Sequence, residues 1–404
     1  MPMPPPTKQL PKNGGILEVF ITFLTLGLTS FGGPIAHLGY FRNTLVTQKR
    51  WVTENQFSQL LALCQFLPGP ASSQLGFALG LLRAGWSGAI TAFVAFTLPS
   101  VLLLVGFAAL LPALSNPVGE AAVHGLKLVA FIIVADAVLN MAKTLCPDTT
   151  RRTLAALTAA LLLLADTAWF QIVAVAVGGV AGLLLCREPS STGKASIRVF
   201  YSKRLGGTLL GLFFFILIAL PLAQPFLPEL FAIAESFYRA GALVFGGGHV
   251  VLPLLEESIV QPGWVSEEDF LAGYGAAQMI PGPMFAFSAY LGALIPTETS
   301  PWWGAIVAFS FMFLPGFLLI AGILPLWQGL SQLTMANHAI AGINAAVVGL
   351  LGAALYDPIF IAAIYSGTDL AISITGLVML RLWHLSPLIV IAGCLATTLF
   401  PVLF

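Results

Sequence analysis

The sequence predicts an all-α polytopic membrane protein whose two homologous halves lie in inverted topology. Three observations predict this fold class. Only 8% of the 404 residues are charged while 58% are hydrophobic, the apolar runs are long enough for membrane helices, and motifs of the first half recur in the second. Because a soluble domain has about 25% charged residues, the composition excludes a soluble enzyme, a nucleic-acid-binding protein and a disordered chain. The long apolar runs also argue against a β-barrel, whose strands would alternate apolar and polar residues.

Short motifs recur in the same order in the two halves of the chain. Ser30–Gly33 recurs as Val244–Gly247, with Phe-Gly-Gly in both copies. Gln65–Pro70 recurs as Gln278–Pro283, and both copies end in Pro-Gly-Pro. A tryptophan precedes each Pro-Gly-Pro by 17 residues. Ordered matches at nearly constant spacing indicate an internal duplication.

Each half begins with two interrupted apolar segments and continues with four uninterrupted runs. In the first half the interrupted segments are 16–46 and 56–83, and the runs are 86–112, 117–143, 152–166 and 168–186. In the second half the interrupted segments are 229–258 and 267–295, and the runs are 302–328, 335–356, 357–380 and 385–403. One run, 205–224, has no partner and connects the halves. We expect every uninterrupted run to cross a hydrocarbon core of about 30 Å.

These segments divide the chain into four parts. Residues 1–15 are rich in proline and lack the layout of a signal peptide, so we expect a cytoplasmic N-terminal tail. The first repeat covers 16–186, a basic cytoplasmic linker with the connecting transmembrane helix covers 187–228, and the second, inverted repeat covers 229–404.

The distribution of charge bears on whether an interrupted segment crosses the membrane or returns to the side it entered. Residues 1–206 contain 15 Lys and Arg against 7 Asp and Glu, a net charge of +8, whereas residues 207–404 contain 2 against 10, a net charge of −8. Because cytoplasmic loops collect Lys and Arg, re-entrant segments that keep Arg42, Lys49 and Arg50 in the cytoplasm fit better than straight crossings, which stay the alternative. The opposite charge of the second half fits an inverted repeat, as found in many secondary transporters.

The breaks at Phe-Gly-Gly and Pro-Gly-Pro are where binding chemistry is predicted. Each break would start a half-helix whose free N–H groups and partial charge of about +0.5 attract an anion. Four such ends would suit a divalent oxyanion, whereas the alternative is that the breaks only let helices kink or pack closely. The candidate substrate-binding residues at the breaks are Ser30, Gly32, Gly33, His37, Gln65, Gly69, Ser72, Ser73 and Gln74 in the first half, and Gly246, Gly247, His249, Gln278 and Gly282 in the second.

Two charged residues inside apolar segments, Lys127 and Arg239, complete the set of candidates. Charges at such positions are functional candidates by default, and each is expected either to contact the anion or to form a structural ion pair. Glu235 lies four residues before Arg239 on the same helix face, where the two can pair. Ser72–Gln74 correspond to Phe285–Phe287 in the repeat, so the site is expected to be more polar on the first half.

Cysteines and cofactor motifs give no sign of a metal site or of catalysis. The four cysteines lie far apart without a C-x-x-C motif, and we interpret them as small buried hydrophobic side chains. No H-E-x-x-H, G-x-S-x-G or nucleotide-binding motif is present. We therefore expect no catalytic residue, metal or cofactor, and a driving force that comes from an ion gradient, the membrane potential or a separate subunit.

The motifs at the breaks resemble those of the chromate ion transporter (CHR) family in its long, two-domain bacterial form. The resemblance is carried by Phe31–Pro34, Gln65–Pro70, Phe245–His249 and Gln278–Pro283, and it extends over nearly the whole chain. It implies a secondary transporter, not an enzyme, that exports chromate across the bacterial inner membrane and confers chromate resistance. The implied partners are chromate or sulfate, the lipid bilayer and a proton or other coupling ion, with no nucleic acid; a homodimer is left open. An intramembrane enzyme and a passive anion channel are the rival classes.

Overall fold

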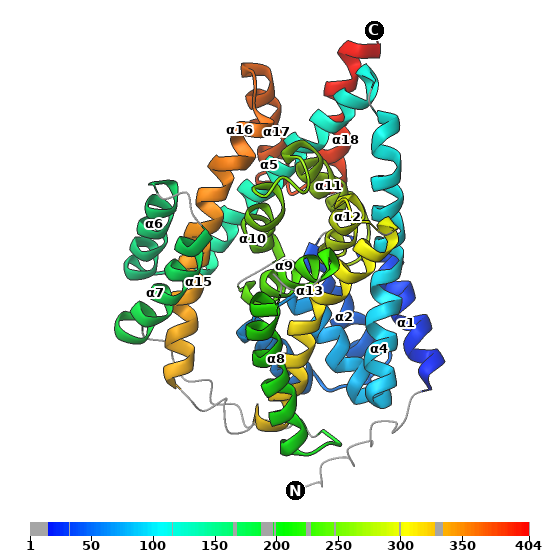
Figure 1. Cartoon of the computed structure of the whole chain (residues 1–404), viewed down its shortest axis with the longest axis vertical. Coiled ribbons are helices and arrows are strands. Elements are labelled where there is room, and N and C mark those ends of the chain that lie inside the picture. The colour runs from blue at the N-terminus through cyan, green and yellow to red at the C-terminus, as the bar shows by residue number, and fades with distance from the viewer. Residues whose placement is uncertain are drawn as a thin grey trace, which may run out of the picture.

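In the computed structural model the regular elements of the described residues are all helices (Figure 1). It describes residues 15–31, 33–114, 116–164, 168–186, 197, 199–223, 228–245, 248–298, 300–327 and 334–403, and these contain no strand. The N-terminal tail up to residue 14 and most of the basic linker, 187–196, lie outside the described residues. The all-α fold predicted from the sequence is confirmed.

Two helical hairpins at the start of the chain enter and leave at the same end of the molecule. They are built from α1 (Ile16–Thr29) with α2 (Gly33–Phe41), and from α3 (Glu54–Phe66) with residues 71–83 of α4 (Ala71–Leu110). Trp51 Nε1 donates a hydrogen bond to Glu18 Oε1 (3.1 Å), and Arg83 Nη2 lies 2.9 Å from Glu18 Oε2. Because Glu18 starts the first hairpin, Trp51 follows it and Arg83 ends the second, both hairpins begin and end at the same end of the molecule, as re-entrant hairpins require. We call this group of three residues the first base.

The repeated Trp-Val-Thr/Ser motif explains where the second hairpin of each half begins. Thr53 Oγ1 accepts from the backbone N–H of Gln56 (3.2 Å), and the Gln56 side chain accepts from the N–H of Thr53 (3.0 Å), which is a capping box. In the second half Ser266 Oγ accepts from the N–H of Asp269 (3.1 Å). The hydroxyl at this position satisfies helix N–H groups that would otherwise lack a partner.

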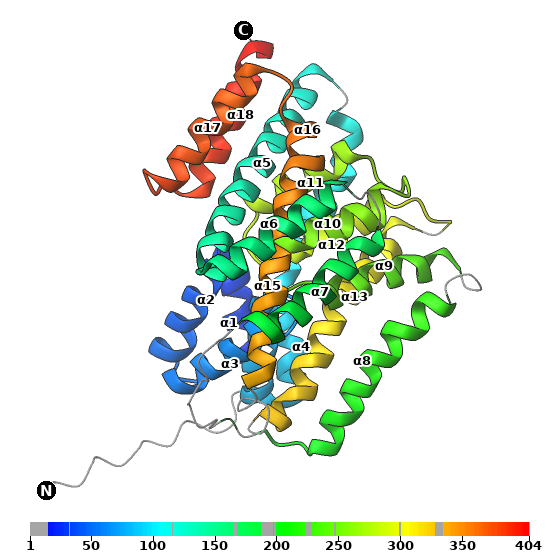
Figure 2. The ribbon, with the colours of Figure 1, turned by 90° about the vertical axis from the view of Figure 1, so that its left-hand side faces the viewer.

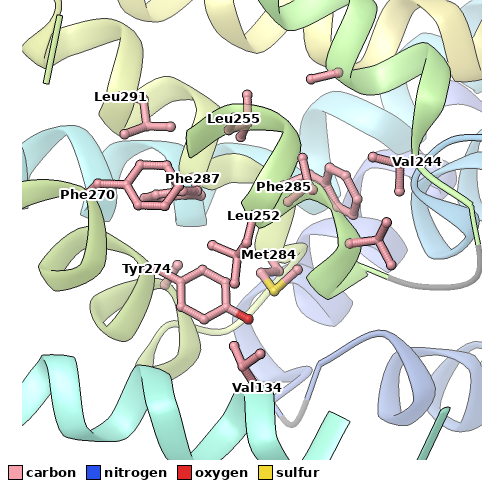
Figure 3. Packing of buried hydrophobic residues seen from close by; sticks show 14 of the residues in the cluster. Val134, Val244, Leu252, Leu255, Phe270, Tyr274, Met284, Phe285, Phe287 and Leu291 are labelled. Carbon is pink, nitrogen blue, oxygen red and sulfur yellow. The ribbon is translucent and has the colours of Figure 1, made fainter. Parts of the chain in front are cut away.

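The second half contains two matching hairpins. They are built from α9 (Glu229–Leu243) with α10 (Val251–Leu255), and from α11 (Glu267–Met279) with α12 (Phe287–Leu294). Tyr290 Oη in α12 donates to the Asp269 carbonyl at the start of α11 (2.7 Å), so this hairpin also closes on itself. Phe270 and Tyr274 of α11 pack on Phe287 of α12, with ring centroids 5.3 and 5.9 Å apart (Figure 3).

A single helix connects the entry points of the two hairpin pairs and shows that they open at opposite ends. α4 leaves helical geometry at Ala84 and Gly85, directly after the first base, and then continues without a break to Leu110. Leu111 and Leu114, which follow it, line a cavity with Glu268 and Asp269 at the start of α11. We call Glu268 and Asp269 the second base. Because about 25 helical residues extend some 37 Å, the two bases lie at opposite ends and the halves are inverted.

Five helical segments in the described part of the chain are long and apolar enough to cross a membrane. They are 71–114, α5 (Pro117–Leu145), α8 (Lys203–Ala223), 301–326, which contains α13 (Pro301–Ile323), and 338–363, which contains most of α15 (Thr334–Ala354). Four further helices are shorter: α6 (Thr149–Leu164), α7 (Ala168–Leu185), α17 (Gly367–Arg381) and α18 (Pro387–Leu403).

The last helices of each half are exchanged between the halves. α5 of the first half packs against α17 and α18 of the second, whereas α15 of the second half packs against α6 and α7 of the first (Figure 2). Gly178 and Gly342 let α7 and α15 approach closely, since a Cβ atom on Gly342 would lie 2.1 Å from the Gly178 carbonyl oxygen. The halves are therefore interlocked.

One predicted helix is divided in the structure. The sequence predicts separate helices at 335–356 and 357–380, and the backbone leaves helical geometry at Asp357, within the turn Leu355–Phe360 that follows α15. The second predicted helix is interrupted, because α16 covers only Ile361–Ala363. The next helix, α17, begins at Gly367, where Ser366 Oγ accepts from the backbone N–H of Asp369 (3.1 Å). The serine cap sets the start of α17, whereas Pro358 directly follows the kink at Asp357.

Candidate functional site

The breaks of the two halves are joined to each other by a symmetric pair of backbone hydrogen bonds. The N–H of Gly69, in the first Pro-Gly-Pro, donates to the Val244 carbonyl beside the second Phe-Gly-Gly (2.7 Å). The N–H of Gly282, in the second Pro-Gly-Pro, donates to the Ser30 carbonyl beside the first (3.0 Å). We call this arrangement the crossing. Each half supplies backbone partners that the broken helices of the other half need inside a membrane.

Glycine is required at both donor positions of the crossing. Gly69 has φ +118° and Gly282 has φ +100°, values that side-chain-bearing residues rarely adopt. A Cβ atom on Gly282 would lie 2.1 Å from Ser100 Oγ, and one on Gly69 would lie 3.1 Å from the Cα atom of Gly316. The α13 and α4 helices therefore pack directly on the two Pro-Gly-Pro breaks.

Polar side chains satisfy the proline carbonyls next to the crossing, but they differ between the halves. Ser100 Oγ on α4 donates to the Pro281 carbonyl (2.7 Å). The corresponding residue on α13 is Gly316, which has no side chain. On that side Gln74 Nε2 donates instead to the carbonyls of Pro68 (2.9 Å) and Gly316 (3.1 Å).

At its breaks and on α4, the first half also carries five fully buried side chains with a polar atom that has no partner among the described residues. They are Ser30, His37, Ser73, Gln74 and Thr97, each at most 2% exposed, and the unpaired atoms are three hydroxyl oxygens, the imidazole Nδ1 and the amide Oε1. At the corresponding positions the second half has only apolar residues: Val244, Val251, Ala286, Phe287 and Phe313. A buried polar atom is costly unless something satisfies it. At these five positions the excess of polar groups lies entirely in the first half.

The half-helices that follow the breaks are also unequal. In the first half α2 starts directly at Gly33, and α4 starts at Ala71 after the first Pro-Gly-Pro. In the second half the 3-10 turns Gly248–Val250 and Met284–Ala286 precede α10 and α12. The sequence predicts four equivalent helix ends, whereas the described residues contain regular α-helical starts only in the first half. Free N–H groups and a helix dipole therefore coincide with the unpaired side chains.

The structure brings only part of the predicted residue set to the crossing. Gly33 and Ser72 lie there, with Ser72 buried. Gln65 is exposed on α3, and Gln278 is half-buried with Nε2 3.1 Å from Met284 Sδ. Gly32, Gly246 and Gly247 lie outside the described residues.

The two candidate histidines have different environments. His37 is fully buried, its Nε2 lies 3.2 Å from the Ser30 carbonyl oxygen, and its ring meets Phe96 edge-on at 5.5 Å. His249 is hydrogen-bonded through Nδ1 to Tyr274 Oη, within the aromatic packing of the second half. His37 therefore belongs to the set of unpaired polar residues, whereas His249 does not.

Lys127 lies away from the crossing, at the second base. Its Nζ is 2.7 Å from Glu268 Oε1 and 5.6 Å from the ring centroid of Tyr365. Lys127 lines a cavity of about 460 Å³ together with the carboxylates of Glu120, Glu268 and Asp269. Because acidic groups outnumber basic ones there, this cavity disfavours a dianion.

Arg239 forms the ion pair that its spacing from Glu235 predicts. Its Nε lies 3.0 Å from Glu235 Oε1, and its Nη2 lies 3.4 Å from Ser258 Oγ. No interaction among the described residues connects Arg239 directly with the unpaired side chains of the first half.

Sequence reasoning missed Thr97 and Ser100. Both lie in the uninterrupted run 86–112, where a hydroxyl residue is unremarkable. The repeat contains the signal that could have found them, because Thr97 aligns with Phe313 and Ser100 with Gly316. A polar residue in one copy against an apolar one in the other marks the asymmetric positions.

Comparisons with known proteins agree with this architecture. A family model described as chromate transporter matches residues 17–183 and 231–399, one stretch in each half. The chain is similar to the probable chromate transport protein of Synechococcus elongatus, with 29% identity over 94% of each chain. It is also similar to the chromate transport protein of Cupriavidus metallidurans, with 26% identity over 93% of this chain and 90% of the relative, and to that of Pseudomonas aeruginosa, with 26% identity over 87% and 83%. No solved structure matches the chain. With both halves matched, the chain belongs to the chromate transporter family.

Proposed function

We propose that this membrane transporter exports chromate, a tetrahedral dianion, across the bacterial inner membrane and so confers chromate resistance. Sulfate has the same shape and charge and is the alternative substrate. The names of the relatives support chromate as the anion. The two inverted halves and their broken helices support a transport mechanism, because such elements form substrate sites near the midplane in many secondary transporters.

The observation that carries the proposal is the one-sided set of unpaired polar groups at the crossing. The hydroxyls of Ser30, Ser73 and Thr97 can each donate a hydrogen bond. His37 Nε2 donates to the Ser30 carbonyl, so Nδ1 of the neutral ring is an acceptor. We propose that these hydroxyl donors bind the oxyanion together with the N–H groups at the starts of α2 and α4. An anion held by dipoles and hydroxyls needs no buried Lys or Arg, whose own desolvation would be costly.

The proposed orientation places the N-terminus and the first base in the cytoplasm. Arg42, Lys49, Arg50 and Arg83 lie in or beside the first-half hairpins, whereas Glu267–Asp269 lie at the entry to the second-half hairpins. Cytoplasmic segments are enriched in Lys and Arg. In this orientation outward movement of a dianion is favoured by about 2.3 kcal/mol of free energy per charge per 100 mV of inside-negative potential.

The proposal is tested by removing single donors without changing shape. The full chain is reconstituted in sealed vesicles, and chromate flux is measured under an imposed potential with sulfate as competitor. Thr97→Val and Ser73→Ala are expected to weaken chromate binding, because a hydrogen bond to a charged group contributes about 1.5–3 kcal/mol, which is about 10- to 150-fold in Kd. Neither change should lower thermal stability, since the lost hydroxyls have no protein partner.

Thr22→Val is the matched control. Thr22 is buried like Thr97, but its hydroxyl already donates to the Glu18 carbonyl (2.6 Å). Its replacement should leave chromate affinity unchanged. Wild-type affinity in both Thr97→Val and Ser73→Ala would remove the unpaired donors from the site. A chromate concentration ratio that never exceeds the ratio set by the membrane potential would favour a passive channel.

A further inference from the structure

A second buried polar cluster lies apart from the crossing, between α9, α7 and the π-helical turn Glu256–Val260 that follows α10. Arg239 is its only basic residue, paired with Glu235 at 3.0 Å and 3.4 Å from Ser258 Oγ. Gln171, Arg239, Glu257 and Ser258 line a common cavity of about 10 Å³. We call these five residues, Glu235 included, the Arg239 cluster.

The charges of the Arg239 cluster do not balance. Glu257 is nine-tenths buried, yet its carboxyl group has no hydrogen bond or ion pair among the described residues. Gln171 Oε1 is likewise buried without a partner. One guanidinium thus faces two carboxyl groups, and the cavity contains a carboxyl and an amide oxygen without donors. A carboxylate left unpaired in such surroundings is costly, and neutralisation is the usual outcome.

A proton fits this cluster better than a metal ion does. A calcium ion takes six to eight oxygen ligands at about 2.3–2.6 Å, and magnesium needs near-octahedral coordination. The cavity has room for about one water molecule. The described residues also contain no group of three or more His, Cys, Asp or Glu that could bind a metal. A proton on Glu257 would cancel the excess charge and supply an O–H donor to a cavity that lacks one.

We propose that Glu257 is the proton-binding residue of this transporter, and that its proton is exchanged with water during each transport cycle. This inference rests on the proposed anion transport. A proton from water forms an O–H bond with a carboxylate oxygen of Glu257, and no other covalent bond changes. Arg239 keeps its ion pair with Glu235. On release the proton returns to water and Glu257 competes with Glu235 for the guanidinium.

The position of the Arg239 cluster couples it to the crossing. Arg239 lies on α9, whose last residue, Leu243, precedes the Val244 carbonyl that accepts from Gly69. Glu257 lies on the segment that follows the same break. The two sides of the second Phe-Gly-Gly break thus carry a guanidinium and a carboxyl group that line the same cavity. The attraction between the Arg239 guanidinium and the Glu257 carboxyl group is stronger when Glu257 is ionised. Protonation of Glu257 therefore weakens the attraction between the two sides of the break.

Other titratable groups lie on the elements that pack against α9, α10 and this turn, and the test must exclude them. They are Glu256 on the turn, His249 at the break, Glu229 and Tyr238 on α9, Lys203 and Arg204 on α8, Glu267, Glu268, Asp269 and Tyr274 on α11, and His338 on α15; the described parts of α7, α10 and α13 carry none. Glu256 is the closest match to Glu257, since it is the adjacent residue with the same side chain and is half-buried.

The first experiment measures coupling. Wild type, Glu257→Gln and Glu256→Gln are reconstituted as full chains, the potential is clamped at zero, and a pH gradient of one unit is imposed. One coupled proton is expected to change the accumulation ratio of chromate about tenfold, since one pH unit corresponds to 1.36 kcal/mol. The shift should persist in Glu256→Gln and vanish in Glu257→Gln. A wild-type ratio that ignores the pH gradient, or a shift that persists in Glu257→Gln, would overturn the proposal.

The second experiment does not depend on transport. Infrared difference spectra recorded between acidic and alkaline pH on purified protein should show the C=O stretch of a protonated carboxyl group shielded from water. This band should be present in wild type and Glu256→Gln and absent in Glu257→Gln; a band retained in Glu257→Gln would overturn the proposal. If Glu257→Gln shows no chromate flux, the infrared band decides whether Glu257 binds the proton. If wild type carries neither chromate nor sulfate, the proposed transport fails, while the infrared band still decides whether Glu257 binds a proton.

Discussion

Gln74 occupies a position where the second half has Phe287, and a second difference in the repeat explains why. Both Pro-Gly-Pro breaks leave a proline carbonyl that needs a donor. Ser100 supplies one to Pro281, but its counterpart is Gly316, which cannot. The amide of Gln74 therefore takes over this role at Pro68 and also reaches the Gly316 carbonyl. Gly316 on α13 lacks the hydroxyl that Ser100 has on α4, and the side-chain amide of Gln74 supplies the missing donor.

Removing the Gln74 amide should destabilise the protein, and a serine at position 316 should repair part of the damage. Gln74→Leu leaves buried carbonyls without a donor, which costs about 1–3 kcal/mol for an unsatisfied group. In Gln74→Leu/Gly316→Ser the new hydroxyl copies Ser100 and should recover part of the loss. Thermal unfolding in detergent measures both. Gln65→Leu, the same change at an exposed position, is the control, and equal stability of Gln74→Leu and wild type would contradict the assigned role.

At the scale of elements, the hairpin tips complete each other. A tip that enters the membrane and returns must break helical hydrogen bonding, and its free groups must find partners within the protein. Here Gly69 finds Val244 and Gly282 finds Ser30, always in the opposite half. The second-half hairpins are thus the complement of the first-half ones rather than a separate unit, and a change at one tip reaches both.

Gly282→Ala should abolish most transport while the protein still inserts. An alanine at φ +100° carries backbone strain of about 1–3 kcal/mol, and its Cβ would collide with Ser100 Oγ. The tip must shift and loosen its bond to Ser30, so we expect chromate flux to fall more than tenfold. Gly106→Ala is the control, because no atom lies within 4 Å of an added Cβ there. Wild-type flux in Gly282→Ala would show that the crossing geometry is not needed.

The sequence could predict the elements better than their partners. Glycine and proline at the breaks and the opposite charges of the halves leave local patterns, so the broken helices and the inversion were predictable. The pair of Lys127 with Glu268 joins residues far apart in the chain, and no local pattern encodes it. Thr97 lies in a continuous apolar run and is visible only through its contrast with Phe313. The start of α17 was missed because the cap at Ser366 is a second boundary, separate from the kink at Asp357 that the proline marks.

At the scale of the whole molecule, the exchange of the last helices restricts how access can alternate. α5 packs on α17 and α18, and α15 packs on α6 and α7. Rocking one complete half against the other would therefore break both of these interfaces. Movement of the hairpin pairs against a fixed frame of outer helices would keep them. We therefore expect the hairpins with the crossing, rather than the halves, to be the moving units.

Inverted, re-entrant halves predict that the entry points of the two hairpin pairs are reached from opposite sides of the membrane. Lys49 follows the first hairpin and Gln261 follows the matching hairpin of the second half, and both are exposed. The native cysteines, Cys64, Cys146, Cys186 and Cys394, are buried, so they provide a silent background for labelling. In intact cells a membrane-impermeant maleimide should label Gln261→Cys but not Lys49→Cys, and in inside-out vesicles the pattern should reverse. Straight crossings of the first interrupted segment would instead expose Lys49→Cys on intact cells. Labelling of both variants from the same side would therefore contradict either the re-entrant hairpins or the inversion, whatever anion the protein carries.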